Sequence, residues 1–218
     1  MQDLAFPIDS VICSGYDAIT TIVDYLHSIG HRKICYLGET KCEQRYTSYV
    51  DSLKRLDLPF DKSSVIDVLF TPSDSYSGLK HALNNGLDCT VIICANNASA
   101  AGVIKALREA RKSIPRDISI VGINDVESTC YLETMLTTIS IPYDEMGKHV
   151  VRLLLDRINH GHYAPVKLYI PSRLVVRDSC IPVDCGWPAG SDGVDKANVI
   201  FFLLDFSKTN SVIYYTKC

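Results

Sequence analysis

The chain has 218 residues, of which 47% are hydrophobic and 22% are charged, a balance that gives an ample core to one large domain or two small ones. Its formal charge of −3 and its pI near 6.0 show no excess of positive charge, so this chain is not expected to bind nucleic acid by itself. Nine cysteines without a Cys-x-x-Cys pair give no support to a zinc or redox motif and favour reduced thiols in a cytoplasmic protein. The N-terminal residues resemble neither a signal peptide nor a transit peptide, and the longest apolar run, 199–204, is too short to span a membrane.

Apolar runs alternate with helical patterns from the N-terminus to residue 125. In the helical patterns, apolar residues recur at i, i+3, i+4 and i+7, as at Ala100, Val103, Ile104 and Leu107. This alternation predicts an α/β fold with a doubly wound parallel sheet. The predicted strands cover 9–13, 33–37, 65–69, 90–95 and 118–123; the helices cover the segment that closes at Gly30, 43–56, 75–85 and the segment between Asn97 and Pro115; 70–73 is predicted as a loop.

The pattern changes after Asp125. A mixed segment at 127–135 precedes an extended run at 136–141, a long helix over 143–159 and two strand-like runs at 166–170 and 173–176. Beyond Cys180 the composition shifts to Pro, Gly and Asp and then to apolar and aromatic runs at 199–206 and 211–216. We interpret this tail as a separate hairpin or as sequence outside the domain.

Two polar tips follow predicted strands, Asn96-Asn97 and Asn124-Asp125. In open α/β sheets, ligands bind at the carboxyl ends of the strands, so these tips are candidates for a binding site. The alternative is that these side chains only cap helices. Arg45 lies in the first turn of its predicted helix, where a cation opposes the helix dipole, so the position needs another reason.

Several enzyme signatures are absent from the sequence. It contains no G-x-G-x-x-G, no Walker A loop, no G-x-S-x-G elbow and no H-E-x-x-H, and its six histidines are scattered. We therefore expect no catalysis, no metal and no cofactor, with histidines at the surface or at helix caps. An enzyme on a flavodoxin-like sheet remains an alternative, because such folds host many chemistries.

Six landmarks occur in order along the chain. They are Gly30-His31-Arg32-Lys33-Ile34, Arg45-Tyr-Thr-Ser-Tyr49, Ala95-Asn96-Asn97 with Ala100-Ala-Gly102, 114–122, 136–139 with Pro142 and Met146-Gly147, and 173–179. Their order and spacing resemble those of the effector-binding domain of the lac/gal repressor family of bacterial transcription regulators. The resemblance covers 9–179 and implies the two-lobed fold of periplasmic sugar-binding proteins, with an effector held between the lobes. A periplasmic-type solute-binding protein of a transporter is the alternative reading.

The resemblance also implies site residues. Arg45 would hydrogen-bond the effector, Asn96 matches a ligand-binding asparagine, and Phe70 and Tyr143 would be aromatic walls. Asn97 and Asn124 each stand where the family usually has an aspartate, which removes formal negative charge from the expected cleft. We expect Arg45, Asn96 and Asn124 to converge on one cleft. A homodimer surface would include Ala101, Tyr131 and Leu132.

The departures from the family concern the ends of the chain. Relative to the family, this sequence lacks the DNA-binding headpiece and most of the first lobe. We expect a complete second lobe over 14–139 and 172–180, first-lobe pieces at 1–13 and 140–171, and a tail over 181–218 without a counterpart. The apolar stripe of the helix at 143–159 would then be exposed, namely Met146, Val150, Leu153 and Leu154, unless the tail covers it, and useful effector affinity is not expected from this chain alone.

Overall fold

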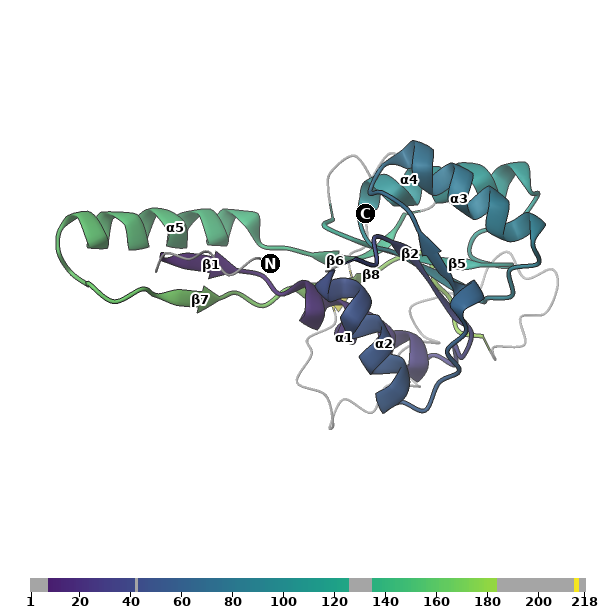
Figure 1. Ribbon diagram of the computed structural model, residues 1–218, viewed down its shortest axis with the longest axis horizontal. Coiled ribbons are helices and arrows are strands. Elements are labelled where there is room, and N and C mark those ends of the chain that lie inside the picture. The colour runs from purple at the N-terminus through teal and green to yellow at the C-terminus, as the bar shows by residue number, and fades with distance from the viewer. Residues whose placement is uncertain (1–7, 42, 126–134, 184–213, 216–218) are drawn as a thin grey trace.

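The computed structural model describes residues 8–41, 43–125 and 135–183 and the backbone of 214–215. Figure 1 shows a rounded lobe of helices around a sheet and an elongated arm that extends away from it. The helices are α1 (Gly15–Ser28), α2 (Gln44–Arg55), α3 (Pro72–Asn84), α4 (Asn97–Glu109) and α5 (Tyr143–Ile158), with a short 3-10 turn at Lys62–Ser64. The strands are β1 (Ser10–Ile12), β2 (Ile34–Gly38), β3 (Val65–Asp67), β4 (Val91–Cys94), β5 (Ser119–Ile123), β6 (Thr137–Ser140), β7 (Lys167–Tyr169), β8 (Arg173–Val176) and β9 (Tyr214–Tyr215).

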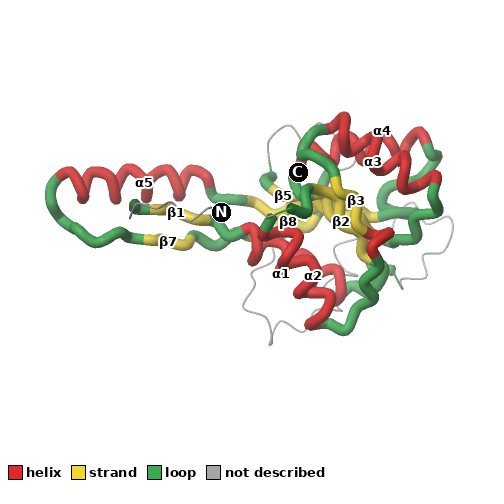
Figure 2. Tube along the Cα trace, viewed as in Figure 1, coloured by secondary structure: helices red, strands yellow, loops and turns green. Residues whose placement is uncertain are grey.

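The central sheet, whose strands are yellow in Figure 2, has the strand order β3-β2-β4-β5-β6-β8-β9. Strands β3, β2, β4, β5 and β6 are parallel to one another, with registers such as Cys35 opposite Ile92 and Val121 opposite Thr137. Strand β8 runs antiparallel to β6, and β9 runs parallel to β8. This topology confirms the predicted doubly wound α/β fold. We call this sheet with α1–α4 the sensor lobe.

Two hydrophobic clusters cover the two faces of the sheet. Helices α1 and α2 pack on one face around Ile19, Leu26 and Tyr49, whereas α3 and α4 pack on the other face around Leu79 and Leu107. The residues of β4 are all buried, as expected for a parallel strand covered on both sides.

Helices α3 and α4 approach closely at Gly102. A Cβ added to this glycine would lie 2.1 Å from the Pro72 carbonyl oxygen and 2.9 Å from the Tyr76 nitrogen, so only a hydrogen fits there. The predicted loop over 70–73 was wrong at its end, because α3 already begins at Pro72. Thr71 caps this helix by accepting from the Asp74 nitrogen, and the fixed φ of proline suits the first helical position.

Strands β1 and β7 form a separate two-stranded parallel sheet beside α5, and we call these three elements the arm. No residue of α5 is buried. Val150 and Leu154 of the expected stripe are 51% and 56% exposed, and Met146 and Leu153 are half-buried. A groove of about 320 Å³ lies between α5 and β1, lined by Ile8, Asp9, Ser10, Val11, Val150, Leu153, Leu154 and Arg157.

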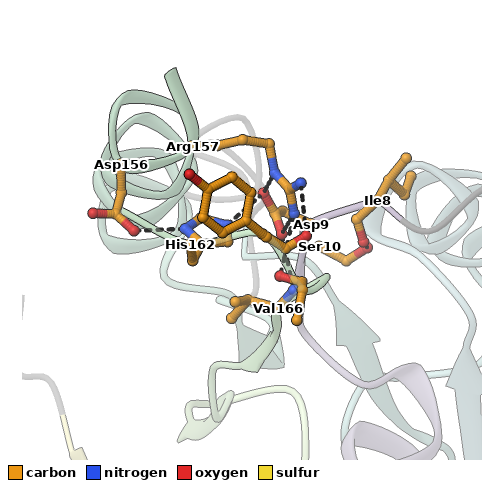
Figure 3. A network of polar contacts seen from close by, with 9 residues as sticks. Ile8, Asp9, Ser10, Asp156, Arg157, His162 and Val166 are labelled. Atoms are coloured by element: carbon orange, nitrogen blue, oxygen red, sulfur yellow. Dashed lines mark hydrogen bonds and ion pairs between the residues drawn. The ribbon is translucent and has the colours of Figure 1, made fainter. Parts of the chain in front are cut away.

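A polar network holds the arm together at one end (Figure 3). The carboxylate of Asp9 accepts two hydrogen bonds from the Arg157 guanidinium, at 2.5 and 2.6 Å, and one from the Val166 nitrogen at 2.8 Å. His162 lies between two carboxylates, with Nδ1 2.5 Å from Asp156 and Nε2 3.0 Å from Asp9. The hydrogen bonds from Arg157 and Val166 hold the pKa of Asp9 well below its usual value, and those to Asp156 and Asp9 raise the pKa of His162.

His31 differs from the expected surface or capping histidine, because it is only 2% exposed. Its Nε2 lies 3.1 Å from the Ile181 carbonyl oxygen and its Nδ1 lies 2.8 Å from the Thr90 hydroxyl. The carbonyl can only accept, so Nε2 carries the proton and Nδ1 is the acceptor of the neutral ring. Burial lowers the pKa of His31 to about 4, which keeps the ring neutral.

The tail is attached to the sensor lobe where the structure describes it. The Val183 nitrogen donates to the Ile29 carbonyl, and β9 continues the central sheet beside β8. Tyr214–Tyr215 thus belongs to the central sheet, and the interpretation of the rest of the tail stays a prediction, because 184–213 and 216–218 lie outside the described residues. Residues 127–134 of the predicted mixed segment also lie outside them. Within the described ranges, no helix is both long and apolar enough to span a membrane.

Candidate effector site

A pocket of about 300 Å³ lies at the carboxyl edge of the central sheet, where α1 and α2 begin. It gathers residues from the chain after β1, from the starts of both helices, from the end of β5 and from the chain after β6. This position matches the edge at which open α/β sheets bind ligands. The pocket is lined by Cys13, Ser14, Gly15, Ala18, Glu43, Gln44, Arg45, Ile123, Asn124 and Ile141.

Arg45 is held in this pocket by an ion pair with Glu43. Its Nε and Nη2 donate to the two carboxylate oxygens of Glu43 at 3.0 and 3.2 Å, and its Nη1 donates to the Ala95 carbonyl at 2.5 Å. Both side chains are about four-fifths buried. Three of the five N–H groups of the guanidinium are therefore engaged in contacts that the structure describes, and one N–H on Nη1 and one on Nη2 remain.

Glu43 also explains how a cation such as Arg45 is tolerated at the start of a helix, where the helix dipole disfavours positive charge. Its carboxylate caps α2 by accepting from the Arg45 backbone nitrogen at 3.1 Å, so an anion lies where the helix dipole favours one. Burial raises the pKa of Glu43, but the hydrogen bonds from the Arg45 side chain and backbone outweigh burial, and the net pKa is lowered. Glu43 is thus ionised at neutral pH.

Two further residues fix the Arg45 side chain. The Phe70 ring lies under the guanidinium, with the Arg45 Cζ atom 4.7 Å from the ring centroid, a cation–π arrangement. Gly15 lies against the aliphatic stem, because a Cβ at this position would be 3.2 Å from Arg45 Cγ. Phe70 therefore supports the pocket from behind Arg45 and is not among the residues that line it.

Asn124 lines the pocket from the end of β5, with its backbone at φ +95°. Its nitrogen donates to the Ile139 carbonyl at 2.9 Å, which continues the pairing of β5 with β6. Directly after it, Asp125 accepts two hydrogen bonds from Arg177, at 2.7 and 3.2 Å. These contacts on both sides of Asn124 hold a backbone conformation that few residues adopt.

Asn96 and Asn97 lie outside the pocket lining. Asn96 caps α4, since its Oδ1 accepts from the Ser99 nitrogen at 2.7 Å and its Nδ2 donates to the Phe70 carbonyl at 3.3 Å. Asn97 is 4% exposed, and its Oδ1 accepts from the Thr138 hydroxyl at 3.2 Å inside the lobe. Asn97 therefore changes no charge in the pocket, contrary to our expectation, and only Asn124 stands there in place of an aspartate.

The remaining predicted residues are spread over other surfaces. Tyr143 is 56% exposed at the start of α5 and is not among the pocket residues. Ala101 is exposed on α4, as a dimer surface would require, and Tyr131 and Leu132 lie outside the described residues. In the described part of the chain, no three metal-ligating side chains come together.

Sequence reasoning missed Glu43, Ser14 and Arg177. The signal for Glu43 was its place directly before the helix, where an acceptor satisfies free backbone N–H groups. The contact of Arg177 with Asp125 spans 52 residues of sequence and leaves no local pattern. Chemically, the pocket offers hydrogen-bond donors and acceptors beside the apolar surfaces of Ala18, Ile123 and Ile141. This combination suits a small polar molecule.

Comparison with known proteins places the fold among sensor domains. Residues 23–180 match the periplasmic binding protein-like domain family. The curated relatives include the HTH-type transcriptional repressor MelR of Bacillus subtilis, 29% identical over 187 residues, and the HTH-type transcriptional repressor PurR of Glaesserella parasuis, 31% identical over 182 residues. Each alignment covers 79% of this chain and 53% or 52% of the relative, so the chain spans about half the length of the curated relatives it matches.

Solved structures give the same result. A sugar-binding transcriptional regulator of the LacI family from Escherichia coli, complexed with phosphate, superimposes with a TM-score of 0.73 at 25% identity, over 79% of this chain and 63% of that one. A LacI family regulator from Enterococcus faecium with bound ribose gives a TM-score of 0.72 at 26% identity, over 80% and 66% of the two chains.

Proposed function

Because this chain belongs to the lac/gal repressor family, as a periplasmic binding protein-like effector domain, we propose that its pocket binds a small polar effector and that the occupied pocket regulates transcription. These two relatives are HTH-type transcriptional repressors, which favours a regulator over a transporter's solute-binding protein. They also favour a non-catalytic role, since repressors are not enzymes.

One observation carries this proposal. Arg45 and Asn124, 79 residues apart in the sequence, line the same pocket at the ligand-binding edge of the sheet. The two N–H groups of Arg45 that remain could donate to hydroxyl oxygens of a ligand. The Asn124 amide could both donate and accept, which suits a hydroxyl better than an aspartate does. The Ser14 hydroxyl is a further donor, because its oxygen already accepts from the Asp17 nitrogen.

The proposal includes two partners. The first is operator DNA, which a helix-turn-helix segment like that of the HTH-type relatives would bind. A protein with this role would act in the cytoplasm. A homodimer would use the exposed face of α4 that carries Ala101, together with Tyr131 and Leu132. Sedimentation of the chain at high concentration tests the second partner, because a persistent monomer would contradict a dimer through this face alone.

The effector proposal is tested by NMR titration of the ¹⁵N-labelled chain with ribose and other uncharged sugars. The pocket is not fully enclosed, so we expect affinities of about millimolar, with too little enclosed surface for micromolar binding. Shifts should concentrate at Ser14, Arg45 and Asn124. Arg45→Met should weaken binding at least about tenfold, because it removes charge-assisted hydrogen bonds.

Arg55→Met is the matched control, since Arg55 also lies in α2 but pairs with Asp24 at the surface. It should bind sugars as the unmodified chain does. Equal binding by Arg45→Met, or shifts that map away from the pocket, would contradict the proposed site.

A further inference from the structure

We propose that Glu43 sets the charge of the effector: its carboxylate occupies the anion-binding side of Arg45 and so restricts the pocket to uncharged ligands. This inference rests on the proposed function in placing the effector at this pocket. It adds a specificity-determining residue that acts through the charge of the site and not through a contact with hydroxyl groups.

The first argument is the electrostatic inventory of the pocket. Among the lining residues that the structure describes, Glu43 and Arg45 are the two with charged side chains, and they form one ion pair with two hydrogen bonds. The nearby carboxylate of Asp125 is bound to Arg177, so it does not change this balance. The net formal charge of the lining is therefore zero.

The second argument is that the two helix N-termini and the guanidinium at the pocket favour an anion. Helices α1 and α2 both begin at the pocket, at Gly15 and Gln44, and a helix N-terminus carries a partial positive charge. The Arg45 guanidinium adds a full positive charge. Without a carboxylate of its own, this pocket would attract a phosphate or carboxylate group, and Glu43 supplies that carboxylate from within the chain.

The third argument is the geometry of the guanidinium. Glu43 takes Nε–H and one N–H of Nη2, the pair of parallel donors on one side of the fork. Ala95 takes an N–H of Nη1. An external anion in the pocket would meet the negative charge of Glu43 and could not use the Nε side. An uncharged hydroxyl needs only one of the two remaining N–H groups and meets no such repulsion.

Inorganic phosphate, at constant ionic strength, is the probe that tests this inference. The readout is the Nε–Hε resonance of Arg45 in the ¹⁵N-labelled chain. Glu43→Gln removes the charge but keeps an oxygen that can cap α2. Removing one like charge about 5 Å from the ligand changes an equilibrium by about tenfold, so this variant should bind phosphate at least about tenfold more tightly than the unmodified chain.

Two further variants separate this effect from others. Glu109→Gln makes the same change on α4, where Glu109 pairs with Lys80 at the surface, and should leave phosphate binding unchanged. The double variant Glu43→Gln with Arg45→Met should lose the gained affinity. If Glu43→Gln does not give a dispersed spectrum, Glu43→Ser keeps a strong helix cap without the charge and takes its place.

Equal phosphate affinity of the unmodified chain and the Glu43 variants would overturn the inference, as would a gain that persists without Arg45. A parallel titration with ribose separates this result from failure of the proposed function. A gain in phosphate binding without any ribose binding to the unmodified chain would support the role of Glu43 and contradict the sugar site. Ribose binding without a phosphate gain would do the reverse.

Discussion

The Arg177 guanidinium donates two hydrogen bonds to the Asp125 carboxylate, from Nη1 at 2.7 Å and from Nη2 at 3.2 Å. The same Nη1 donates to the Leu136 carbonyl at 2.9 Å. The two side chains are 11% and 16% exposed. This pair joins the chain after β8 to the end of β5, one residue from Asn124. The position of a pocket residue thus depends on an ion pair outside the pocket.

Arg177→Met should destabilise the protein by about 3 kcal/mol, because it leaves the Asp125 carboxylate largely buried without its partner. The backbone amide of Asn124 should also shift in the NMR spectrum. Urea unfolding gives the free energy. Arg55→Met is the control, since its exposed pair with Asp24 should contribute at most about 1 kcal/mol. Equal losses in the two variants would contradict a structural role for the buried pair.

Gly102→Ala should destabilise the protein by about 3 kcal/mol, because its Cβ would lie 2.1 Å from the Pro72 carbonyl oxygen and α3 and α4 would have to separate. Gly147→Ala is the matched control within α5. A Cβ there meets no atom within 4 Å, so it should stabilise the helix by about 1 kcal/mol. Urea unfolding for Gly102 and helix content by circular dichroism for Gly147 test the two effects, and similar destabilisation by both would contradict this account.

Most of the fold follows from the sequence, because the apolar pattern depends on which faces are buried. The strand at 173–176 and the start of α5 at residue 143 were predicted as observed. The direction of β8 was not predicted, because side-chain alternation is the same in parallel and antiparallel strands. The start of α3 was missed because proline was interpreted as a loop residue.

The candidate site was harder to predict. Placement after a strand was enough to select Asn96 and Asn124. It was not enough to separate a side chain that caps a helix from one that lines a pocket. Asn97 follows the cap, and its Oδ1 accepts from the Thr138 hydroxyl inside the lobe, a long-range contact that leaves no local sequence pattern. The pairing of Glu43 with Arg45 depends on a rotamer, which no sequence pattern records. The roles of these residues in binding stay predictions.

Stability should rise with pH between about 4 and 6.5 because of His31. The pKa of this ring is about 4 in the folded chain, lowered by burial, and near 6.5 when unfolded. Between these values the unfolded state binds more protons, so the neutral ring stabilises the fold above pH 6.5 and this contribution is lost as the pH falls to 4. The loss amounts to about 3 kcal/mol.

His31→Gln checks this contribution. Glutamine cannot titrate, and its amide can still donate to the Ile181 carbonyl. The difference in unfolding free energy between the two proteins should therefore change across pH 4 to 6.5. A constant difference would show that His31 titrates normally in the folded chain.

The arm should be most stable between the titrations of Asp9 and His162. The lowered pKa of Asp9 means that its contribution is present above the unfolded value near 3.8 and is lost in acid. The raised pKa of His162 means that its contribution is complete below about 6.5 and is lost as the pH rises through the folded value. Hydrogen exchange of the Val166 amide, corrected for intrinsic rates, should therefore slow in the intermediate window.

Asp9→Asn should speed exchange of the Val166 amide at every pH in this window, because the charge that pairs with Arg157 and His162 is gone. Asp51→Asn is a control on the sensor lobe, where Asp51 accepts from the Tyr16 hydroxyl far from this network. Unchanged exchange in Asp9→Asn would mean that β1 and β7 hold the arm without the network.

The arm is joined to the sensor lobe by three passages of the chain, after β1, after β6 and before β8, and Figure 1 shows that it extends away from the lobe. Cys13 and Ile141 lie on two of these passages and also line the pocket. The pocket therefore lies at the junction from which the arm extends, and any rotation of the arm would pivot there. The arm's 16-residue helix is about 24 Å long, so a small rotation at Cys13 and Ile141 would be multiplied into a much larger displacement at the far end of α5.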